Sequence, residues 1–102
     1  MIAVYQTKAF IKSAKHMLRQ DTVQAIAEML ATQPLAGSLI AHSGGLRKLR
    51  VPRPGMGKRG GARVIYYFVS AEGAVYLLYA YAKADSDDLT KDQYARLRAQ
   101  LK

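Results

Sequence analysis

The chain has 102 residues, of which half are apolar, and it contains no cysteine. This composition predicts one compact domain, residues 1–102, and excludes a disordered tail, a disulfide framework and a thiolate metal site. No apolar run approaches the roughly 20 residues of a membrane span, and no secretory signal opens the sequence. We therefore expect a cytoplasmic protein that has no membrane partner.

The formal net charge is +9, and the positive charges are unevenly placed. No acidic residue occurs between Glu28 and Glu72. This interval contains seven cations, which are Arg47, Lys48, Arg50, Arg53, Lys58, Arg59 and Arg63. Because a solvated surface normally mixes charges of both signs, these uncompensated cations predict a polyanionic partner such as a nucleic acid. A basic face that only maintains solubility is the alternative interpretation.

The first third of the chain predicts a strand and two helices. Residues 1–6 are short, apolar and rich in strand formers. Thr7 can cap a first helix, and Asp21, followed three residues later by glutamine, can cap a second. The second helix should end before Pro34, because proline disfavours helix in the residue that precedes it. These signals predict a helical hairpin joined by residues 19–21.

The remainder of the chain predicts strands and a final helix. After an irregular segment, residues 46–51 alternate in the manner of a strand. Residues 62–70 and 74–83 should form a hairpin, whose three-residue turn places a glycine in the left-handed position. Thr90 begins a capping box that opens a C-terminal helix. The order β-α-α-β-β-β-α indicates an α+β fold, with the helices gathered on one side of an antiparallel sheet.

The length of the turn determines which residues face one another in the hairpin. A three-residue turn places Tyr67 opposite Leu77 and Arg63 opposite Tyr81, with Lys83 on the same face as Tyr81 and diagonal to Arg63. Two cations and a phenol at one end of a sheet can form a phosphate site, because arginine offers a planar fork and lysine a point charge. In the alternative interpretation Arg63 covers the edge of the sheet and the tyrosines are packing residues.

The glycine-rich stretch "PGMGKRGGAR", residues 54–63, is similar to two nucleotide-binding patterns, and both fail on context. The dinucleotide fingerprint G-x-G-x-x-G requires a helix after the glycines, but the residues that follow predict a strand. A P-loop requires serine or threonine after its lysine, and Arg59 occupies that position. The glycines instead predict a loop that can approach a nucleic-acid backbone closely.

Two segments within residues 44–93, "GGLRKLRVPRPGMGKRGGARVIYYF" and "VYLLYAYAKADSDDLTKDQ", resemble the RelE/ParE superfamily of bacterial toxins, and specifically its HigB-like branch. The resemblance implies the RelE-like fold and an endoribonuclease that cleaves messenger RNA, typically on the ribosome. It also implies a cognate antitoxin that holds the toxin inactive in a hetero-oligomeric complex. The reaction would need no metal and no other cofactor.

The resemblance further implies which residues act. Enzymes of this kind let an RNA 2′-hydroxyl attack the adjacent phosphate, and preorganised cations neutralise the charge that develops there. The catalytic residues would be Arg63, which stabilises the phosphate, together with Lys83, Lys58 and Tyr81. The residues that bind the RNA backbone would be Arg47, Lys48, Arg50, Arg53 and Arg59. The identity of the general base stays open, and Tyr94 competes with Tyr81 for the position beside the reacting phosphate.

Two other functions stay open at this point. A ParE-like toxin would poison gyrase and cut no RNA, and a non-catalytic module would bind RNA or the ribosome through counter-ion release. The dense basic segment and the predicted proximity of Arg63 and Lys83 favour the ribonuclease. His16, predicted to lie in the first helix, and His42 do not have the spacing of a paired site.

Overall fold

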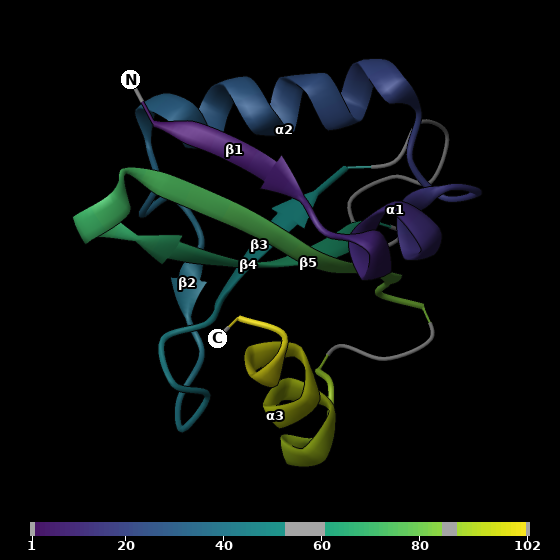
Figure 1. The fold of residues 1–102 in the computed structure, drawn as a ribbon. Coiled ribbons are helices and arrows are strands. Elements are labelled where there is room, and N and C mark those ends of the chain that lie inside the picture. Colours follow the sequence, from purple (N-terminus) through teal and green to yellow (C-terminus); the bar gives the residue numbers. More distant parts are fainter. Residues whose placement is uncertain (1, 53–60, 85–87, 102) are drawn as a thin grey trace.

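The computed structural model describes residues 2–52, 61–84 and 88–101. In these residues it contains three α-helices and a five-stranded sheet with strand order β1-β5-β4-β3-β2 (Figure 1). The elements in chain order are β1 (Ala3–Gln6), α1 (Lys8–Ala14), α2 (Gln20–Thr32), β2 (Ser38–Leu39), β3 (Arg47–Val51), β4 (Ala62–Val69), a 3₁₀ helix (Ser70–Glu72), β5 (Ala74–Ala82) and α3 (Lys91–Ala99). No helix in the described part of the chain is long and apolar enough to cross a membrane.

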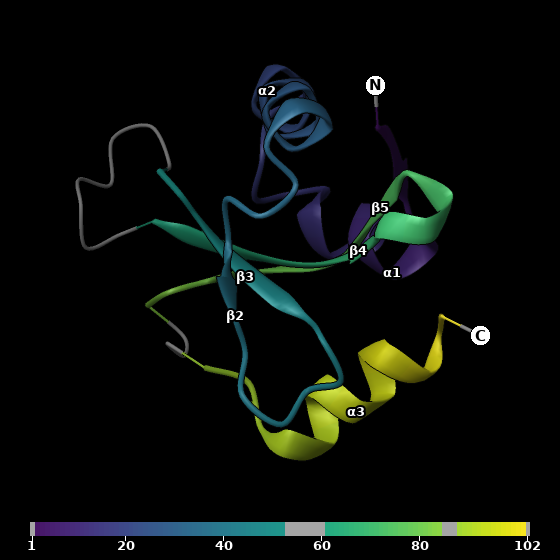
Figure 2. The ribbon, with the colours of Figure 1, turned by 90° about the vertical axis from the view of Figure 1, so that its left-hand side faces the viewer.

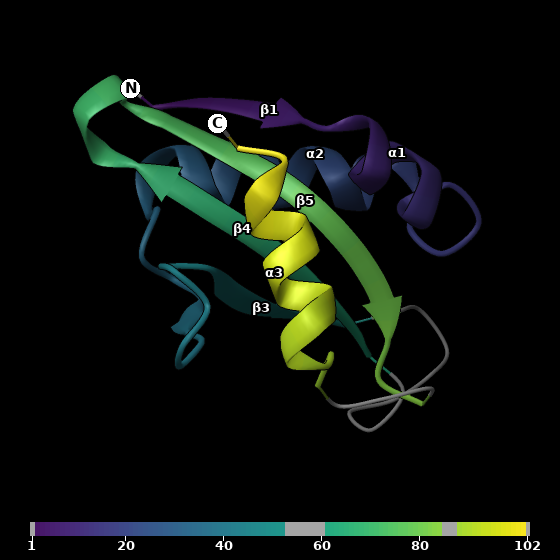
Figure 3. The same ribbon diagram turned by 60° about the horizontal axis from the view of Figure 1, so that its bottom comes forward.

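The sheet carries helices on both faces (Figure 2). Ile26 and Leu30 of α2 belong to a buried cluster on one face, whereas Tyr94 and Leu97 of α3 belong to a separate cluster on the other. Figure 3 shows α3 crossing β4 and β5 on that second face. The prediction that all helices lie on one side is therefore wrong. The reason is that β4 is buried on both faces, since residues 62–66 are all buried.

The α+β class is confirmed, but the sheet differs from the predicted one in two ways. β1 runs parallel to β5, so the sheet is mixed and not purely antiparallel. β2 lies in the segment predicted to be irregular, and it pairs antiparallel with Arg47 and Lys48 of β3. A strand of two residues is too short to produce an alternating sequence pattern.

Two of the three predicted helix caps are confirmed. The hydroxyl of Thr7 accepts a hydrogen bond at 3.2 Å from the backbone N–H three residues later, and both hydrogen bonds of the capping box at Thr90 are present. The cap at Asp21 is wrong, because α2 begins at Gln20 with Arg19 as its N-cap. Asp21 instead lies in the first turn, and its Oδ2 is 3.3 Å from Nη2 of Arg19. At this end of a helix the helix dipole also stabilises a carboxylate.

The hairpin turn is one residue longer than predicted. The connection between β4 and β5 comprises the 3₁₀ helix and Gly73, whose φ of 62° is left-handed as expected. Because four residues make this connection, Tyr67 faces Tyr76. The predicted pairing of Tyr67 with Leu77 is wrong.

A β-bulge restores the predicted register further along the hairpin. The pairing shifts by one residue beside Ile65, which faces Tyr79, so Leu78 is the extra residue of β5. Beyond the bulge Arg63 faces Tyr81, which confirms that part of the prediction. Because a bulge adds one residue to one strand, Leu78 and Tyr79 both pack in the cluster beneath α3.

Candidate functional site

Three polar side chains form a row across the sheet, on the face that α3 covers. Arg50 of β3 faces Arg63 of β4, and Arg63 faces Tyr81 of β5. Tyr81 belongs to the buried cluster beneath α3, and residues that face one another across strands share a face of the sheet. The structure thus brings together three of the predicted site residues, which we call the Arg50–Arg63–Tyr81 row.

The members of this row differ in exposure. The exposed fraction is 4% for Arg63 and 6% for Tyr81, whereas Arg50 is exposed. Nη1 of Arg63 donates a hydrogen bond at 3.2 Å to the carbonyl oxygen of Ala62. A guanidinium sheltered from water interacts with an anion more strongly than an exposed one. The row therefore combines one accessible arginine with one buried arginine.

The hydroxyl of Tyr81 is held in its protonated form. Burial raises the pKa of Tyr81 far above its ordinary value of 10.0, and the charge and hydrogen bond of Tyr94 and the charge of Asp88 raise it further. The positive charge of Arg63 acts in the opposite direction but does not prevail. At neutral pH this phenol can donate a hydrogen bond or a proton, but it cannot serve as a general base.

An ion pair connects the segment that precedes α3 to the sheet. Lys48 lies two residues from Arg50 on β3, hence on the same face, and its Nζ lies 2.5 Å from Oδ1 of Asp88. The side chain of Lys48 is 17% exposed and that of Asp88 is 68% exposed. Nearby, the backbone N–H of Leu89 donates to the hydroxyl of Tyr94 at 3.2 Å. These contacts hold residues 88–94 against the end of the sheet that carries the row.

Gly61 lies where β3, β4 and the end of β5 meet. Its carbonyl oxygen accepts a hydrogen bond at 3.0 Å from the backbone N–H of Lys83, which directly follows β5 and is half-buried. A Cβ at Gly61 would lie 2.8 Å from the carbonyl oxygen of Val51 and 3.7 Å from Nη1 of Arg63. Glycine is therefore required for the close approach of two backbones beside Arg63.

Arg47 lies on the opposite face of the sheet from the row. It faces Tyr66, which belongs to the cluster beneath α1 and α2. Its Nη1 donates a hydrogen bond at 2.7 Å to the carbonyl oxygen of Gly37. This contact supports the loop before β2, so the position of Arg47 does not favour its predicted role in RNA binding, which stays a prediction.

Three predicted site residues, Arg53, Lys58 and Arg59, lie outside the described residues. Asp88 could not be assigned to the site from the sequence, because its partner Lys48 is 40 positions away and no local pattern connects them. The return of acidic residues after the long basic interval is the signal that could have found it. Tyr94 and Tyr81 do not exclude one another, since they are hydrogen-bonded.

Neither histidine contributes to the row. His16 is exposed in the turn after α1, and not within the helix as predicted. His42 is exposed in the loop between β2 and β3 and has a φ of 57°. Within residues 2–52, 61–84 and 88–101, no group of three or more His, Cys, Asp or Glu residues is placed to hold a metal ion.

Comparisons with known proteins identify relatives in both sequence and fold. The model of the RelE family, the RelE toxin of the RelE/RelB toxin–antitoxin system, matches residues 2–102. A mutant of the Escherichia coli toxin RelE in the free state has a TM-score of 0.63 and 12% identity, with 95% of this chain and 96% of that chain covered.

Two structures from Helicobacter pylori are also similar. The conserved hypothetical protein HP0892 has a TM-score of 0.57 and 18% identity, and the match covers 83% of this chain and 98% of that chain. A metal-bound toxin has a TM-score of 0.50 and 14% identity, and the match covers 84% of this chain and 99% of that chain. The predicted RelE-like fold is confirmed.

Proposed function

The chain belongs to the RelE family and is the toxin of a toxin–antitoxin system with an antitoxin as its partner, and from this premise we propose that it is an endoribonuclease. It would cleave messenger RNA on the ribosome, in the cytoplasm and without a metal ion, and thereby stop translation. The observation that carries the proposal is the Arg50–Arg63–Tyr81 row, which combines two guanidinium groups with a protonated phenol.

The two arginines suit different stages of the reaction. Arg50 is exposed and can contact a phosphate of the RNA backbone first. Arg63 is buried, so its charge would stabilise mainly the phosphorane, because the phosphorane carries more negative charge than the ground-state phosphate. Because residues 88–94 pack against this end of the sheet, the RNA has to displace them in part to reach Arg63.

The proton transfers divide between Tyr81 and another group. Tyr81 keeps its proton at neutral pH, which suits hydrogen bonding to the phosphorane or donation to the leaving 5′ oxygen. The base that takes the 2′ proton must then come from elsewhere, and Lys83 and Lys58 are the candidates. Lys48, Arg53 and Arg59 would hold the flanking RNA backbone, with the RNA competing against Asp88 for Lys48.

A cleavage assay with the purified chain tests this proposal. The substrate is a single-stranded RNA, alone or bound to ribosomes, and its matched control carries a 2′-deoxyribose at the cleaved position. Cleavage that yields a 2′,3′-cyclic phosphate and a 5′-hydroxyl end, and that the deoxyribose abolishes, is the expected result. An uncut RNA in both settings would overturn the proposal.

Variants then test the row. We expect Arg63→Ala and Arg63→Lys to lower kcat by about 10²–10³-fold, as the loss of one charge-stabilising group does elsewhere. Arg50→Ala should act mainly on KM. Lys12→Ala, which removes an exposed cation from α1, is the matched control and should leave the rate unchanged. Thermal unfolding of each variant separates loss of activity from loss of fold.

Expression in cells that lack the antitoxin distinguishes the competing functions. New messenger RNA 5′ ends within coding regions, absent for Arg63→Ala, support the ribonuclease. Growth arrest with intact messages and damaged DNA would assign the chain to gyrase poisoning. RNA binding that persists without new 5′ ends, and weakens gradually with each lost cation, would leave a binding module.

A further inference from the structure

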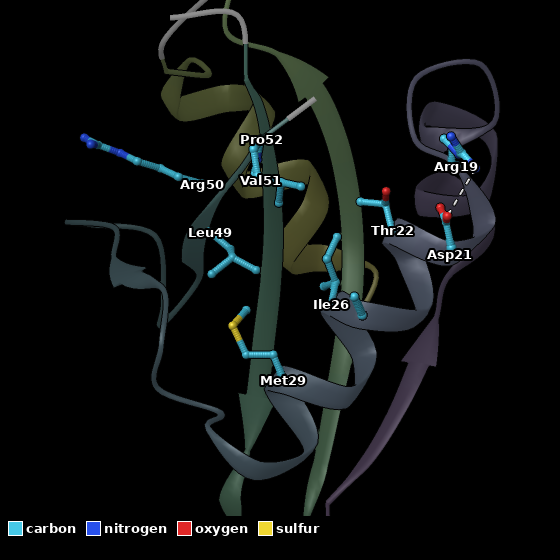
Figure 4. A pocket seen from close by; sticks show the side chains of 10 residues that line it. Arg19, Asp21, Thr22, Ile26, Met29, Leu49, Arg50, Val51 and Pro52 are labelled. Atoms are coloured by element: carbon cyan, nitrogen blue, oxygen red, sulfur yellow. Dashed lines mark ion pairs between the residues drawn. The ribbon is translucent and has the colours of Figure 1, made fainter. Parts of the chain in front are cut away.

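Six of the seven tyrosines of the chain lie on the side of the sheet that carries α3. They are Tyr5, Tyr67, Tyr76, Tyr79, Tyr81 and Tyr94. Tyr66, which belongs to the cluster beneath α1 and α2, is the exception. The opposite side differs, because the groove between α2 and β3 is lined by side chains such as Ile26, Met29 and Leu49 (Figure 4). None of the described residues that line this groove is aromatic.

Four of the six tyrosines form two stacked pairs along β5 and β1. The ring centroids of Tyr81 and Tyr79 are 6.3 Å apart, and the rings are inclined by 28°. The ring centroids of Tyr76 and Tyr5, which face one another across the two strands, are 5.4 Å apart, with an inclination of 23°. We call these four residues the tyrosine track. It begins at the Arg50–Arg63–Tyr81 row and ends at the edge strand β1.

The tyrosine track becomes more exposed with distance from the row. Tyr81 is 6% exposed, and both Tyr79 and Tyr76 are half-buried. Tyr5, at the outer end, is 52% exposed. Figure 3 shows β1 and the second half of β5 beside α3 and not behind it. A strand of RNA that is bound at the row can therefore follow the track along the flank of α3 without crossing the helix.

The length of the track suits a short run of nucleotides. Tyr76 and Tyr81 are five positions apart on β5, which corresponds to roughly 15 Å. About four nucleotides span the same distance at the roughly 3.4 Å spacing of stacked bases. The track can therefore accept the few nucleotides that adjoin a phosphate held at the row.

The charges differ between the two ends of the track. Arg50 and Arg63 lie at the row, and Figure 4 shows the side chain of Arg50 pointing away from α2. At the outer end, the hydroxyl of Tyr76 donates a hydrogen bond at 3.2 Å to Oε1 of Glu72. This carboxylate repels a phosphate but not an uncharged base. Phosphates are therefore favoured at the row and bases at the outer end.

Tyr67 is close to the track but already has a partner. It faces Tyr76, yet the guanidinium carbon of Arg98 lies 4.4 Å from the centroid of its ring. Nη2 of Arg98 also donates a hydrogen bond at 3.3 Å to its hydroxyl. Because a cation occupies one face of this ring, Tyr67 is not part of the track.

We propose that bases of single-stranded RNA stack on Tyr79, Tyr76 and Tyr5 while the row holds the phosphate that is cleaved. This inference rests on the proposed function, because it extends the same site. Aromatic side chains on a sheet are a common platform for unpaired bases, and the stacking tolerates any sequence because every base has a flat face. The track would add affinity for nucleotides on one side of the cleaved bond.

Substitutions at Tyr5 test the outer end of the track. The probe is a single-stranded RNA with a 2′-deoxyribose at the cleaved position, extended by about four nucleotides on one side or on the other. For one of the two extended RNAs, we expect Tyr5→Ala to weaken binding by about fivefold or more. Tyr5→Phe keeps the ring and should bind as the wild type does. Unchanged affinity of Tyr5→Ala for both RNAs would overturn the proposal.

Ile11→Ala is the matched control for the loss of an exposed apolar side chain. Ile11 lies on α1 and is 51% exposed, nearly the same as Tyr5. This variant should bind both extended RNAs with the affinity of the wild type. Thermal unfolding of each variant verifies that the fold is intact. An equal loss of affinity in Ile11→Ala and Tyr5→Ala would overturn the proposal, because the effect would not be specific to the track.

Salt dependence separates stacking from charge. Stacking releases no counter-ions, so Tyr5→Ala should lower the affinity by the same factor at about 50 mM and about 200 mM salt. A loss that vanishes at the higher concentration would mean that the substitution acts through electrostatics, and the proposal would fail.

Photo-crosslinking locates the bases directly. RNAs that carry 5-iodouridine at one position each, beside the deoxyribose, are irradiated with the wild type, and the cross-linked peptides are identified by mass spectrometry. We expect cross-links to Tyr5, Tyr76 or Tyr79. Cross-links confined to other residues would overturn the proposal.

Cleavage assays separate this inference from the proposed function. If the wild type cleaves RNA but Tyr5→Ala binds both extended RNAs normally, the track is overturned and the ribonuclease stands. If the wild type cleaves no RNA but Tyr5→Ala weakens its binding and the cross-links form, the track stands and the ribonuclease does not. If Tyr5→Ala weakens only the binding of the antitoxin, the track is a protein interface and the proposal is overturned.

Discussion

Tyr66 and Gly37 lie so close that a Cβ at Gly37 would be 2.7 Å from Cε1 of the tyrosine ring. The hydroxyl of Tyr66 accepts the N–H of Gly37 at 2.9 Å and donates to the carbonyl oxygen of Pro34 at 2.7 Å. Arg47 binds the carbonyl oxygen of the same glycine. The sheet therefore holds the loop before β2 through two buried or half-buried polar side chains, and the loop in turn places β2 on β3.

We expect Tyr66→Phe to lower the free energy of unfolding by about 1–3 kcal/mol, because it leaves a buried N–H and a carbonyl without their partner. Urea unfolding measures the loss. Tyr5→Phe, at a tyrosine that is 52% exposed, is the control and should change stability by less than about 0.5 kcal/mol. Similar values for both variants would mean that the hydroxyl of Tyr66 does not secure the loop.

We expect Gly61→Ala to disturb the candidate site more than Gly73→Ala. The new Cβ at Gly61 would lie 2.8 Å from the carbonyl oxygen of Val51, so β3 must move beside Arg63, at about 1–3 kcal/mol. At Gly73 nothing lies within 4 Å of the new Cβ, and the φ of 62° alone costs about 1 kcal/mol. RNA cleavage at equal fractions of folded protein should fall for Gly61→Ala only. Full activity of Gly61→Ala would show that the site tolerates this shift.

Tyr81 should make the protein less stable at alkaline pH. Its pKa in the folded state is raised above the ordinary value of 10.0, chiefly by burial. The stabilisation is therefore complete below pH 10 and is lost as the pH rises toward the folded-state pKa, by up to about 1.4 kcal/mol per pH unit. Unfolding experiments at about pH 8 and about pH 11 on wild type and Tyr81→Phe should show a smaller alkaline loss in the variant. Parallel losses in both proteins would contradict this assignment.

Asp88→Asn should strengthen RNA binding with little change in stability. The substitution removes the charge that pairs with Lys48 near the row, and an ion pair whose carboxylate is 68% exposed contributes at most about 1 kcal/mol to folding. Fluorescence titration with a non-cleavable RNA should show tighter binding. The plot of log affinity against log salt concentration should be steeper by about the amount that one additional phosphate contact contributes. Asp92→Asn in the first turn of α3 makes the same change in net charge. If it tightens binding equally, the effect comes from net charge and not from Lys48.

The register of the hairpin was predicted correctly for the half that contains Arg63 and wrongly for the half next to the turn. The correct half results from two errors of one residue each, in the length of the turn and in the absence of a bulge, which cancel. The turn is one residue longer than assumed, and the bulge at Leu78 adds one residue to β5, so Arg63 still faces Tyr81 while Tyr67 does not face Leu77. No pattern predicts the bulge, because strands that are buried on both faces show no regular alternation of apolar and polar residues that an extra residue could interrupt.

The same absence of alternation explains why α3 was predicted on the wrong face. Caps at Thr7 and Thr90 were predictable because each depends on residues within one turn of helix. The contacts of Asp88 and Tyr94 depend instead on where α3 packs, which local signals do not determine. The pairing of Arg63 with Tyr81 could be predicted, whereas the pairing of Arg50 with Arg63 and the residues that cover the row could not.

Because Leu78 is the extra residue of the bulge, its deletion would leave the arrangement of the Arg50–Arg63–Tyr81 row unchanged. A chain that lacked this one residue would keep every other pair of the β4–β5 hairpin, because the register on either side already differs by one. It would lose a fully buried side chain beneath α3. In related chains, a single-residue gap at this position should therefore accompany a change in the helix that covers the site, while an arginine still faces a tyrosine at its centre.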